Sequence, residues 1–277
     1  MSNEWYDGFD EDVEFDGRAT TALAIKRIAI MTQQWFKEFA EKRGFPDDYV
    51  VVDIETSGFR PELNLICSIG HGWVKNRKIS KLYDTYLNWS LEPTVEQTKL
   101  QQDLEKTQLS MESKGACFHH TYKKLVCEGQ SPGKVLEYYH DLFQKAIDSG
   151  IMLVMHNGWA FDVRFLEGHF RRWLGKDFTF PEDSIYDTGI CEKASQLDPS
   201  YDPMPRIGET MHDFSKRISG IRARGVRWAL DSHCEETYGL FKLAGVSPGD
   251  AHRSATDCLV MYHLFEQHRA LAEAADG

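Results

Sequence analysis

The sequence lacks three features that would each assign it to a particular class of protein. No apolar run reaches the roughly 18–20 residues needed to span a bilayer. The acidic N-terminus has neither the basic nor the apolar region of a secretory signal. The six cysteines are scattered without a Cys-x-x-Cys pair, which argues against a zinc cluster and a disulfide framework. We therefore expect a cytoplasmic protein with no membrane partner.

Basic residues are scarce: 32 Lys and Arg face 43 Asp and Glu, giving a net charge of −11. This balance is unfavourable for a nucleic-acid binder, because Lys and Arg supply phosphate affinity. The distribution is uneven, however. The first sixteen residues hold seven acids and no base, whereas residues 216–227 hold five bases and no acid: Lys216, Arg217, Arg222, Arg224 and Arg227. The net charge therefore hides patches of opposite sign.

Hydrophobic periodicity predicts a helix first and then strands. The helix covers about residues 20–42 and ends at Gly44, a suitable C′ residue. Three strands, near 49–55, 65–74 and 81–89, follow, and a basic turn separates the last two. Their short spacing predicts an antiparallel meander.

The second half alternates strands with helices. Short apolar runs predict strands at 151–155 and 184–187, and Asp231 or Ser232 is suited to cap a helix that reaches Tyr238. Further helices are predicted at 93–112 (solvated), 135–147, 162–173 and 253–274. This order indicates an α/β fold with a mixed five-stranded sheet, antiparallel first and then parallel, flanked by helices.

The strand near 49–55 ends in two acids. Asp53 and Glu55 are one residue apart, so they project from the same face of the strand. The preceding run, Val50-Val51-Val52, is continuously apolar, as in a strand covered on both faces. Two like charges at the end of a buried strand repel each other unless a cation lies between them. The pair predicts a divalent metal site, although alone it also fits a strand end that faces water.

Two later stretches also place acids at the ends of elements. One follows the apolar strand directly, at a carboxyl end where the sites of open α/β sheets lie: His156-Asn157-Gly158-Trp159-Ala160-Phe161-Asp162. In the other, His252 and Asp257 open the last helix. Asp257 lies among apolar or small positions, which is unusual for an acid that binds nothing.

In this arrangement the sequence resembles the DEDDh 3′→5′ exonucleases, a DnaQ-like family that includes bacterial proofreading subunits and ribonuclease T. The resemblance spans residues 49–270 and rests on three motifs in order: Asp53-x-Glu55-Thr56, His156-Asn157-x-x-x-Phe161-Asp162 and His252-x-x-x-x-Asp257. Tyr186-Asp187-Thr188 and Leu230-Asp231-Ser232-x-Cys234 resemble two lesser features of the family. It implies a ribonuclease H-like fold.

The resemblance also implies phosphodiester hydrolysis with two Mg²⁺ or Mn²⁺ ions. Asp53 would bridge both ions, Glu55 and Asp257 would complete the nucleophile-side ion, and Asp162 would hold the second. Two ions ~3.5–4 Å apart can clamp the attacking and leaving oxygens. Hard oxygen ligands favour Mg²⁺ or Mn²⁺ over zinc. His252 would be the general base, since an imidazole pKa near 6.5 suits that role.

Substrate contacts are expected mainly from the loop after the first motif and from the second motif. A small-residue turn lets a nucleotide approach the backbone, and Phe59 either stacks on the last base or covers the core. Phe161 is equally suited to packing. His156 is expected to be structural, and Asp187 to be a cap or a support. The expected contacts are Thr56, Ser57, Gly58, Phe59, Asn157, Phe161 and His252.

The implied function is 3′→5′ exonuclease activity on nucleic acid with a free 3′ end, most of all single-stranded DNA, releasing nucleoside 5′-monophosphates. An RNA 3′-end trimmer would use the same chemistry. An inert nucleic-acid- or polymerase-binding module would have lost an acid or the histidine, and none is missing. A polymerase or another replication or repair protein is a possible partner, and the sequence does not indicate an oligomeric state.

Domain organisation follows from the same comparison. Residues 1–45 form an acidic arm and a helix without a counterpart in the family, and residues 46–277 form the exonuclease domain. Segments near 90–117 and 196–227 are expected insertions. The second carries the five clustered bases and could guide a strand toward the metals, or be a solvated helix face.

Overall fold

The computed structural model describes residues 18–274, with side chains from residue 30 onward, so the acidic arm of residues 1–17 lies outside it. The strands are β1 (Tyr49–Thr56), β2 (Ile66–Lys75), β3 (Lys78–Tyr86), β4 (Met152–Met155) and β5 (Ile185–Asp187). The α-helices are α1 (Arg18–Arg43), α2 (Gln97–Glu112), α3 (Tyr122–Glu128), α4 (Pro132–Asp148), α5 (Asp162–His169), α6 (Thr188–Ser195), α7 (Met211–Ser219), α8 (Glu235–Tyr238), α9 (Leu240–Ala244) and α10 (Ser254–Ala274). The shorter turns are the 3₁₀ turns η1 (Trp89–Leu91), η3 (Pro199–Tyr201) and η5 (Pro248–Asp250) and the π turns η2 (Phe170–Leu174) and η4 (Leu230–Cys234).

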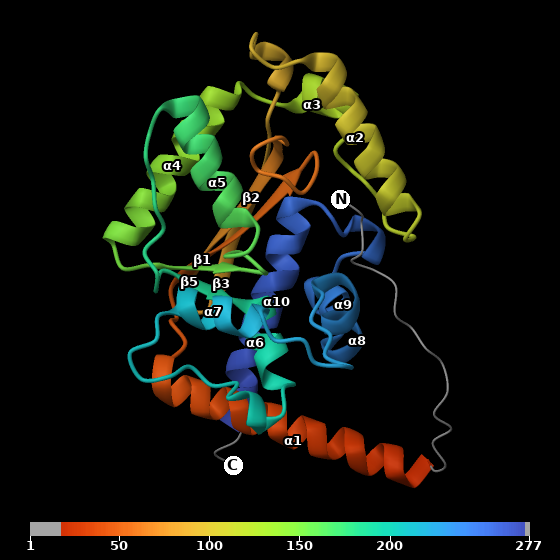
Figure 1. Ribbon diagram of the computed structural model, residues 1–277, viewed down its shortest axis with the longest axis vertical. Coiled ribbons are helices and arrows are strands. Elements are labelled where there is room, and N and C mark those ends of the chain that lie inside the picture. Colours follow the sequence, from red (N-terminus) through yellow and green to blue (C-terminus); the bar gives the residue numbers. More distant parts are fainter. Residues whose placement is uncertain (1–17, 275–277) are drawn as a thin grey trace.

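The five strands form one mixed sheet of order β3-β2-β1-β4-β5 (Figure 1). β1 pairs antiparallel with β2, and β2 with β3, whereas β4 lies parallel to both β1 and β5. The predicted order of an antiparallel meander followed by parallel strands is confirmed, and with it the ribonuclease H-like fold. β1 is central, so the two acids at its end lie where helices from both faces meet.

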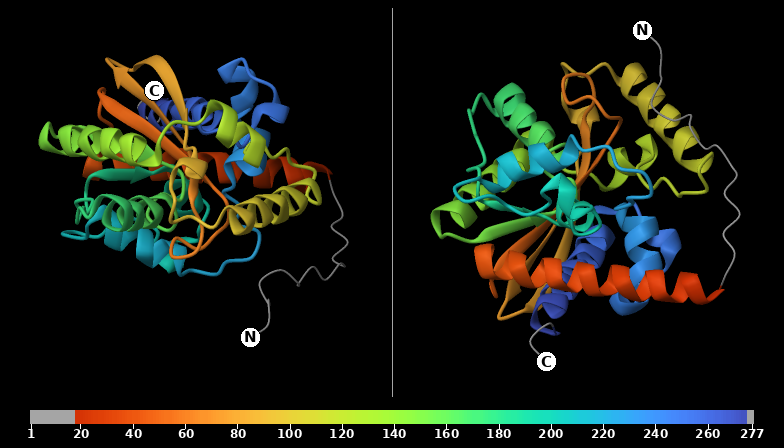
Figure 2. Two further views of the ribbon diagram at one scale, coloured as in Figure 1. Left: turned by 90° about the horizontal axis from the view of Figure 1, so that it is seen from above. Right: turned by 60° about the horizontal axis from the view of Figure 1, so that its bottom comes forward.

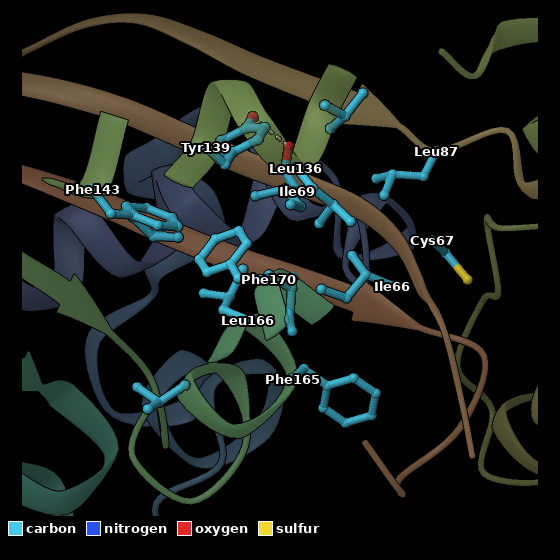
Figure 3. Close-up of a cluster of buried hydrophobic side chains, with 14 of the residues drawn as sticks. Ile66, Cys67, Ile69, Leu87, Leu136, Tyr139, Phe143, Phe165, Leu166 and Phe170 are labelled. Carbon is cyan, nitrogen blue, oxygen red and sulfur yellow. Dashed lines mark hydrogen bonds between the residues drawn. The ribbon is translucent and has the colours of Figure 1, made fainter. Parts of the chain in front are cut away.

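The alternation along β1 divides its side chains between two cores. Val50, Val52 and Ile54 pack with α4 and α5 in one cluster, which Figure 3 shows around Tyr139 and Phe165. Tyr49 and Val51 pack on the opposite face, against residues of α1 and α10. Asp53 and Glu55 continue this second alternation, so they point toward the face that α10 covers.

Two long helices cover this second face. The sequence predicts α1 within two residues, and Gly44 follows it with φ 73°, as a left-handed C′ residue requires. α1 packs across α10 (Figure 2). The Phe36 and His268 rings stack at this contact, with their centroids 4.3 Å apart. No helix within residues 18–274 has both the length and the hydropathy to cross a bilayer.

Several predicted boundaries were wrong. β3 begins at Lys78 because the hairpin turn holds only Asn76 and Arg77, both at positive φ (48° and 64°), which is the two-residue turn that matches strand twist. No side chain caps η4, so the predicted cap at Asp231 or Ser232 is wrong. The helices α3 and α9 lacked a clear periodic signal because both are short.

Candidate active site

The four acids and the histidine of the three motifs meet at one cavity of about 440 Å³. Asp53 and Glu55 come from the end of β1, Asp162 from the first residue of α5, and His252 and Asp257 from the start of α10 and the loop before it. The remaining lining is contributed mostly by apolar side chains: Ile54, Phe59, His156, Asn157, Phe161, Ala229, Leu230, Asp231 and Phe241. The fold therefore brings together all five residues that the three motifs supply.

Asp53 is the motif acid whose buried Oδ2 atom has no hydrogen-bond partner among the residues that the structure describes. Burial raises the pKa of Asp53 well above its usual range, and the nearby charges of Asp257, Asp162 and Glu55 raise it further. Burial and Asp257 likewise raise the pKa of Glu55 to about 8. Such carboxylates need a cation to remain ionised at neutral pH.

Asp162 is held against β1 by its position at the N-terminus of α5. Its Oδ1 accepts a hydrogen bond of 3.2 Å from the Ile54 amide, which lies between the two acids of β1. Burial and the Asp187 charge raise the pKa of Asp162 to about 8, although hydrogen bonds from backbone amides oppose the shift. The helix start thus brings a third carboxylate to the end of the strand.

His252 and Asp257 are linked through the loop that begins α10. The His252 amide donates to Asp257 Oδ2 at 3.1 Å, and His252 has φ 62°, a left-handed conformation unusual for a non-glycine residue. Burial raises the pKa of Asp257 to about 7 against the opposing effect of His252. Ligand atoms of Glu55, His252 and Asp257 lie within 4.8 Å of one another.

Asp231 is a further site residue whose role the sequence did not indicate. Its Oδ2 lies 3.5 Å from Nε2 of His252, and the pair lowers the pKa of Asp231. Burial alone would lower the pKa of His252, but Asp231, Glu55 and Asp257 outweigh it and the net shift is upward. The only signal in the sequence was the motif Leu230-Asp231-Ser232-x-Cys234, from which a cap was expected. The carboxylate faces the histidine instead.

A close approach of α10 to the sheet places Asp257 beside β1. Gly70 of β2 pairs with Asp53, and a Cβ atom at Gly70 would lie 2.4 Å from the backbone carbon of Ser254. A glycine inside a strand often marks such an approach. The first turn of α10 can therefore pack against the sheet at the position next to Asp53.

A buried polar network holds the loop before α10. Ser254 Oγ donates to Asp84 at 2.8 Å and lies 3.0 Å from Ser68 Oγ, which in turn contacts His120 Nε2 at 2.9 Å. The neighbouring His119 contacts the Gly249 carbonyl at 3.1 Å. Burial lowers the pKa of His120 to about 3, so its imidazole is neutral. Residues 119–120 thus hold the loop that carries His252 at both of its ends, Gly249 and Ser254.

The turn after β1 contributes one side chain to the cavity. Thr56 and Ser57 are buried, and they hydrogen-bond to the Gly58 carbonyl and the Leu65 amide respectively. Neither they nor Gly58 line the cavity, so their expected substrate contacts remain a prediction. Phe59, 74% exposed, lines it. Thr107 of α2 donates to the Ser57 carbonyl at 3.0 Å, so the predicted insertion supports this turn.

The second motif is held in place by a buried carboxylate. Asp187 caps α6 and accepts hydrogen bonds from the Asn157 and Trp159 amides, which confirms its expected capping role. His156 hydrogen-bonds to Thr188 at 2.9 Å, and burial lowers its pKa to about 4, as suits a structural residue. Asn157, at φ 57°, lines the cavity beside Phe161.

The donor set fits divalent cations with hard oxygen ligands. The four motif carboxylates, one with an orphaned buried oxygen, line a single cavity together with Asp231, and the described cysteines nearest to it are buried thiols of raised pKa. Mg²⁺ and Mn²⁺ prefer carboxylate oxygens, whereas soft thiolates would select other metals. The residues present therefore fit the ions that the resemblance implies.

The raised pKa values predict that stability falls as pH rises when divalent ions are absent. Glu55, Asp162 and Asp257 ionise near pH 7 to 8 in the folded chain, against ordinary values of 3.8 to 4.5. The folded state therefore binds more protons than the unfolded state across this window, so the free energy of unfolding decreases with pH. We expect the Tm in EDTA to fall between about pH 5 and about pH 8, and Mg²⁺ to restore it chiefly at the upper end. Differential scanning fluorimetry of wild type and Glu55→Gln measures this; a variant with an identical pH profile would contradict it.

The sheet order and the meeting of the five motif residues at one cavity agree with the resemblance to the DnaQ-like 3′→5′ exonucleases. Over 206 residues, 74% of this chain, the sequence is 26% identical to the protein DNA polymerase III PolC-type of Mycoplasmopsis pulmonis (strain UAB CTIP). The chain spans 12% of that protein. No family model matches.

Solved structures of E. coli exonuclease I are also similar. The zinc-bound complex with single-stranded DNA has a TM-score of 0.49 and 13% identity, covering 82% of this chain and 42% of that one. The complex with a dT13 oligonucleotide has a TM-score of 0.49 and 12% identity over 83% of this chain and 42% of that one. The chain thus spans less than half the length of exonuclease I.

Proposed function

We propose that this protein is a metal-dependent 3′→5′ exonuclease that removes nucleoside 5′-monophosphates from single-stranded DNA. The observation that carries the proposal is the orphaned Oδ2 atom of Asp53 among three other acids of raised pKa. Buried like charges of this kind are costly unless a cation neutralises them. The exposed ring of Phe59 and the apolar side chains of Leu230 and Phe241, which also line the cavity, suit an unpaired base.

Asp53, Glu55, Asp162 and Asp257 would hold two Mg²⁺ or Mn²⁺ ions, with Asp53 shared between them. When bound, such ions activate water and neutralise the charge that develops on the phosphate oxygens. The protein itself separates four mutually repelling carboxylates onto three elements, β1, α5 and α10, so that each can contribute oxygen ligands. Two contacts hold these elements together without any ligand. Gly70 allows α10 to approach the sheet closely, and the Ile54 amide donates a hydrogen bond to Asp162 at the start of α5.

His252 would act as the general base. Its imidazole would accept a proton from the attacking water as the water oxygen bonds to phosphorus and the bond from phosphorus to the 3′-oxygen breaks. The leaving oxygen then takes up a proton, which balances the reaction. Asp231, 3.5 Å from Nε2, stabilises the charged imidazolium that forms. Phe59 and Phe161, 6.4 Å apart between ring centroids, would orient the terminal nucleotide.

Oligonucleotides labelled at the 5′ end test this function. We expect stepwise shortening in Mg²⁺ or Mn²⁺, arrest by EDTA, and nucleoside 5′-monophosphates as products. Matched DNA and RNA strands identify the preferred sugar, because a contact to the 2′-OH distinguishes them. Cleavage that persists in EDTA, or products with a 3′-phosphate, would contradict the proposal.

A further inference from the structure

Residues 220–228, here called the basic strap, connect α7 to the cavity. The sequence left open whether the clustered bases lie on a solvated helix face. In the structure α7 ends at Ser219, and the strap that follows is not helical. It runs directly into Ala229, Leu230 and Asp231, which line the cavity.

The side chains of the strap alternate between the core and solvent. Ile221, Ala223 and Val226 pack against the hydrophobic cluster beneath α1 and α10. Arg222, Arg224 and Arg227 are exposed. The apolar side chains therefore anchor the strap so that its three arginines face outward in a row.

Contacts from α6 and from Gln196, which follows it, hold the residue before the strap and the last two residues of the strap. The buried Lys193 donates to the Ser219 carbonyl at 3.0 Å, and its ammonium lies 4.5 Å from the centre of the Trp228 ring. Gln196 donates to the Arg227 carbonyl at 2.7 Å and accepts from the Arg227 amide at 3.3 Å. The arginines are thus presented from a fixed backbone, which reduces the entropy lost on binding a ligand.

The other two bases of the cluster have different surroundings. Arg217 forms a two-pronged ion pair with Glu209 and donates to two carbonyls, so its role is structural. Lys216 is exposed on α7. Arg227 pairs with Glu236 at 3.3 Å, but both side chains are more than half exposed, and a surface pair of this kind contributes little to stability. A phosphate can therefore replace Glu236 as the partner of Arg227.

We propose that the basic strap is a phosphate-binding site for the single strand that lies upstream of the 3′-terminal nucleotide. This inference rests on the proposed nuclease function and adds a path for the substrate. The strap holds no acid, in a chain whose net charge is −11, and it leads into the cavity. Arginine suits this task because its planar fork matches phosphate oxygens. Short substrates that end inside the cavity would not reach the strap.

Two measurements on the triple variant Arg222→Ala, Arg224→Ala, Arg227→Ala test the proposal. The first is binding of a long fluorescent oligothymidylate in Ca²⁺, as a function of salt. Because each phosphate contact to a single strand contributes about 0.7 to the slope of log K against log salt, we expect the slope to fall by about 2. The second is hydrolysis of the p-nitrophenyl ester of thymidine 5′-monophosphate in Mn²⁺, which we expect to be unchanged.

Arg171→Ala is the matched control, since Arg171 is an equally exposed arginine paired with an acid, Asp177 at 2.9 Å, outside the strap. It should leave both measurements at the wild-type value. An unchanged slope and affinity in the triple variant would overturn the inference. If wild type hydrolyses neither the ester nor DNA, the nuclease function fails instead, and the binding slope still decides the role of the strap.

Discussion

Asp53→Asn is expected to abolish exonuclease activity while making the metal-free protein more stable. The substitution removes the carboxylate proposed to be shared by both metal ions, so the loss should exceed the ~10²–10⁴-fold typical of a general base. It also removes a buried carboxyl group whose Oδ2 has no partner and which, without metal, must either take up a proton or repel Asp257, Asp162 and Glu55. End-labelled DNA measures the first effect, and the Tm in EDTA near pH 8 measures the second.

Asp177→Asn is the matched control for this variant, because Asp177 is an exposed acid with a surface ion pair. It should leave both activity and Tm unchanged. In Asp53→Asn, the rise in Tm that Mg²⁺ causes in wild type should shrink. Wild-type activity in Asp53→Asn would mean that the acids are not a metal site, and a lower Tm in EDTA would mean that they do not repel one another.

His252→Asn is expected to slow hydrolysis by about 10²–10⁴-fold without preventing metal binding. Asparagine tolerates left-handed backbone better than most residues, so the loop should keep its φ of 62°. The rise in Tm on adding Mn²⁺ should therefore persist, in contrast to Asp53→Asn. If the metal response disappears together with activity, His252 acts as a ligand, a role that its place within 4.8 Å of Glu55 and Asp257 would allow.

The elements that carry the three motifs could be predicted because their signals are local. The apolar run before Asp53, the strand before His156 and the periodic helix after His252 each specify one element and one end of it. The alternation of β1 also placed Asp53 and Glu55 on one face. Since parallel neighbours in a sheet bring their carboxyl ends to the same edge, the meeting of β1 with the start of α5 followed.

The supports of the site could not be predicted in the same way, because they depend on contacts between distant segments. Gly70 matters only once Ser254, far along the chain, lies against it. Asp231 was expected to cap a helix, and only the position of His252 in the folded chain shows that its carboxylate is a charge partner. The clustered bases of the strap could be read from the sequence. That Ile221 and Ala223 point inward could not, because it depends on the hydrophobic cluster against which they pack.

The hydrogen bonds of His119 and His120 have a consequence for shortening the domain. Deleting the whole stretch between β3 and α3 would remove His119, which hydrogen-bonds to the Gly249 carbonyl, and His120, which contacts Ser254 through Ser68. The left-handed backbone of His252 would then keep only its hydrogen bond to Asp257, so an excision intended to affect only the periphery would loosen the imidazole that we propose as the general base. The exposed residues 112–115 can be removed more easily than the few that follow them.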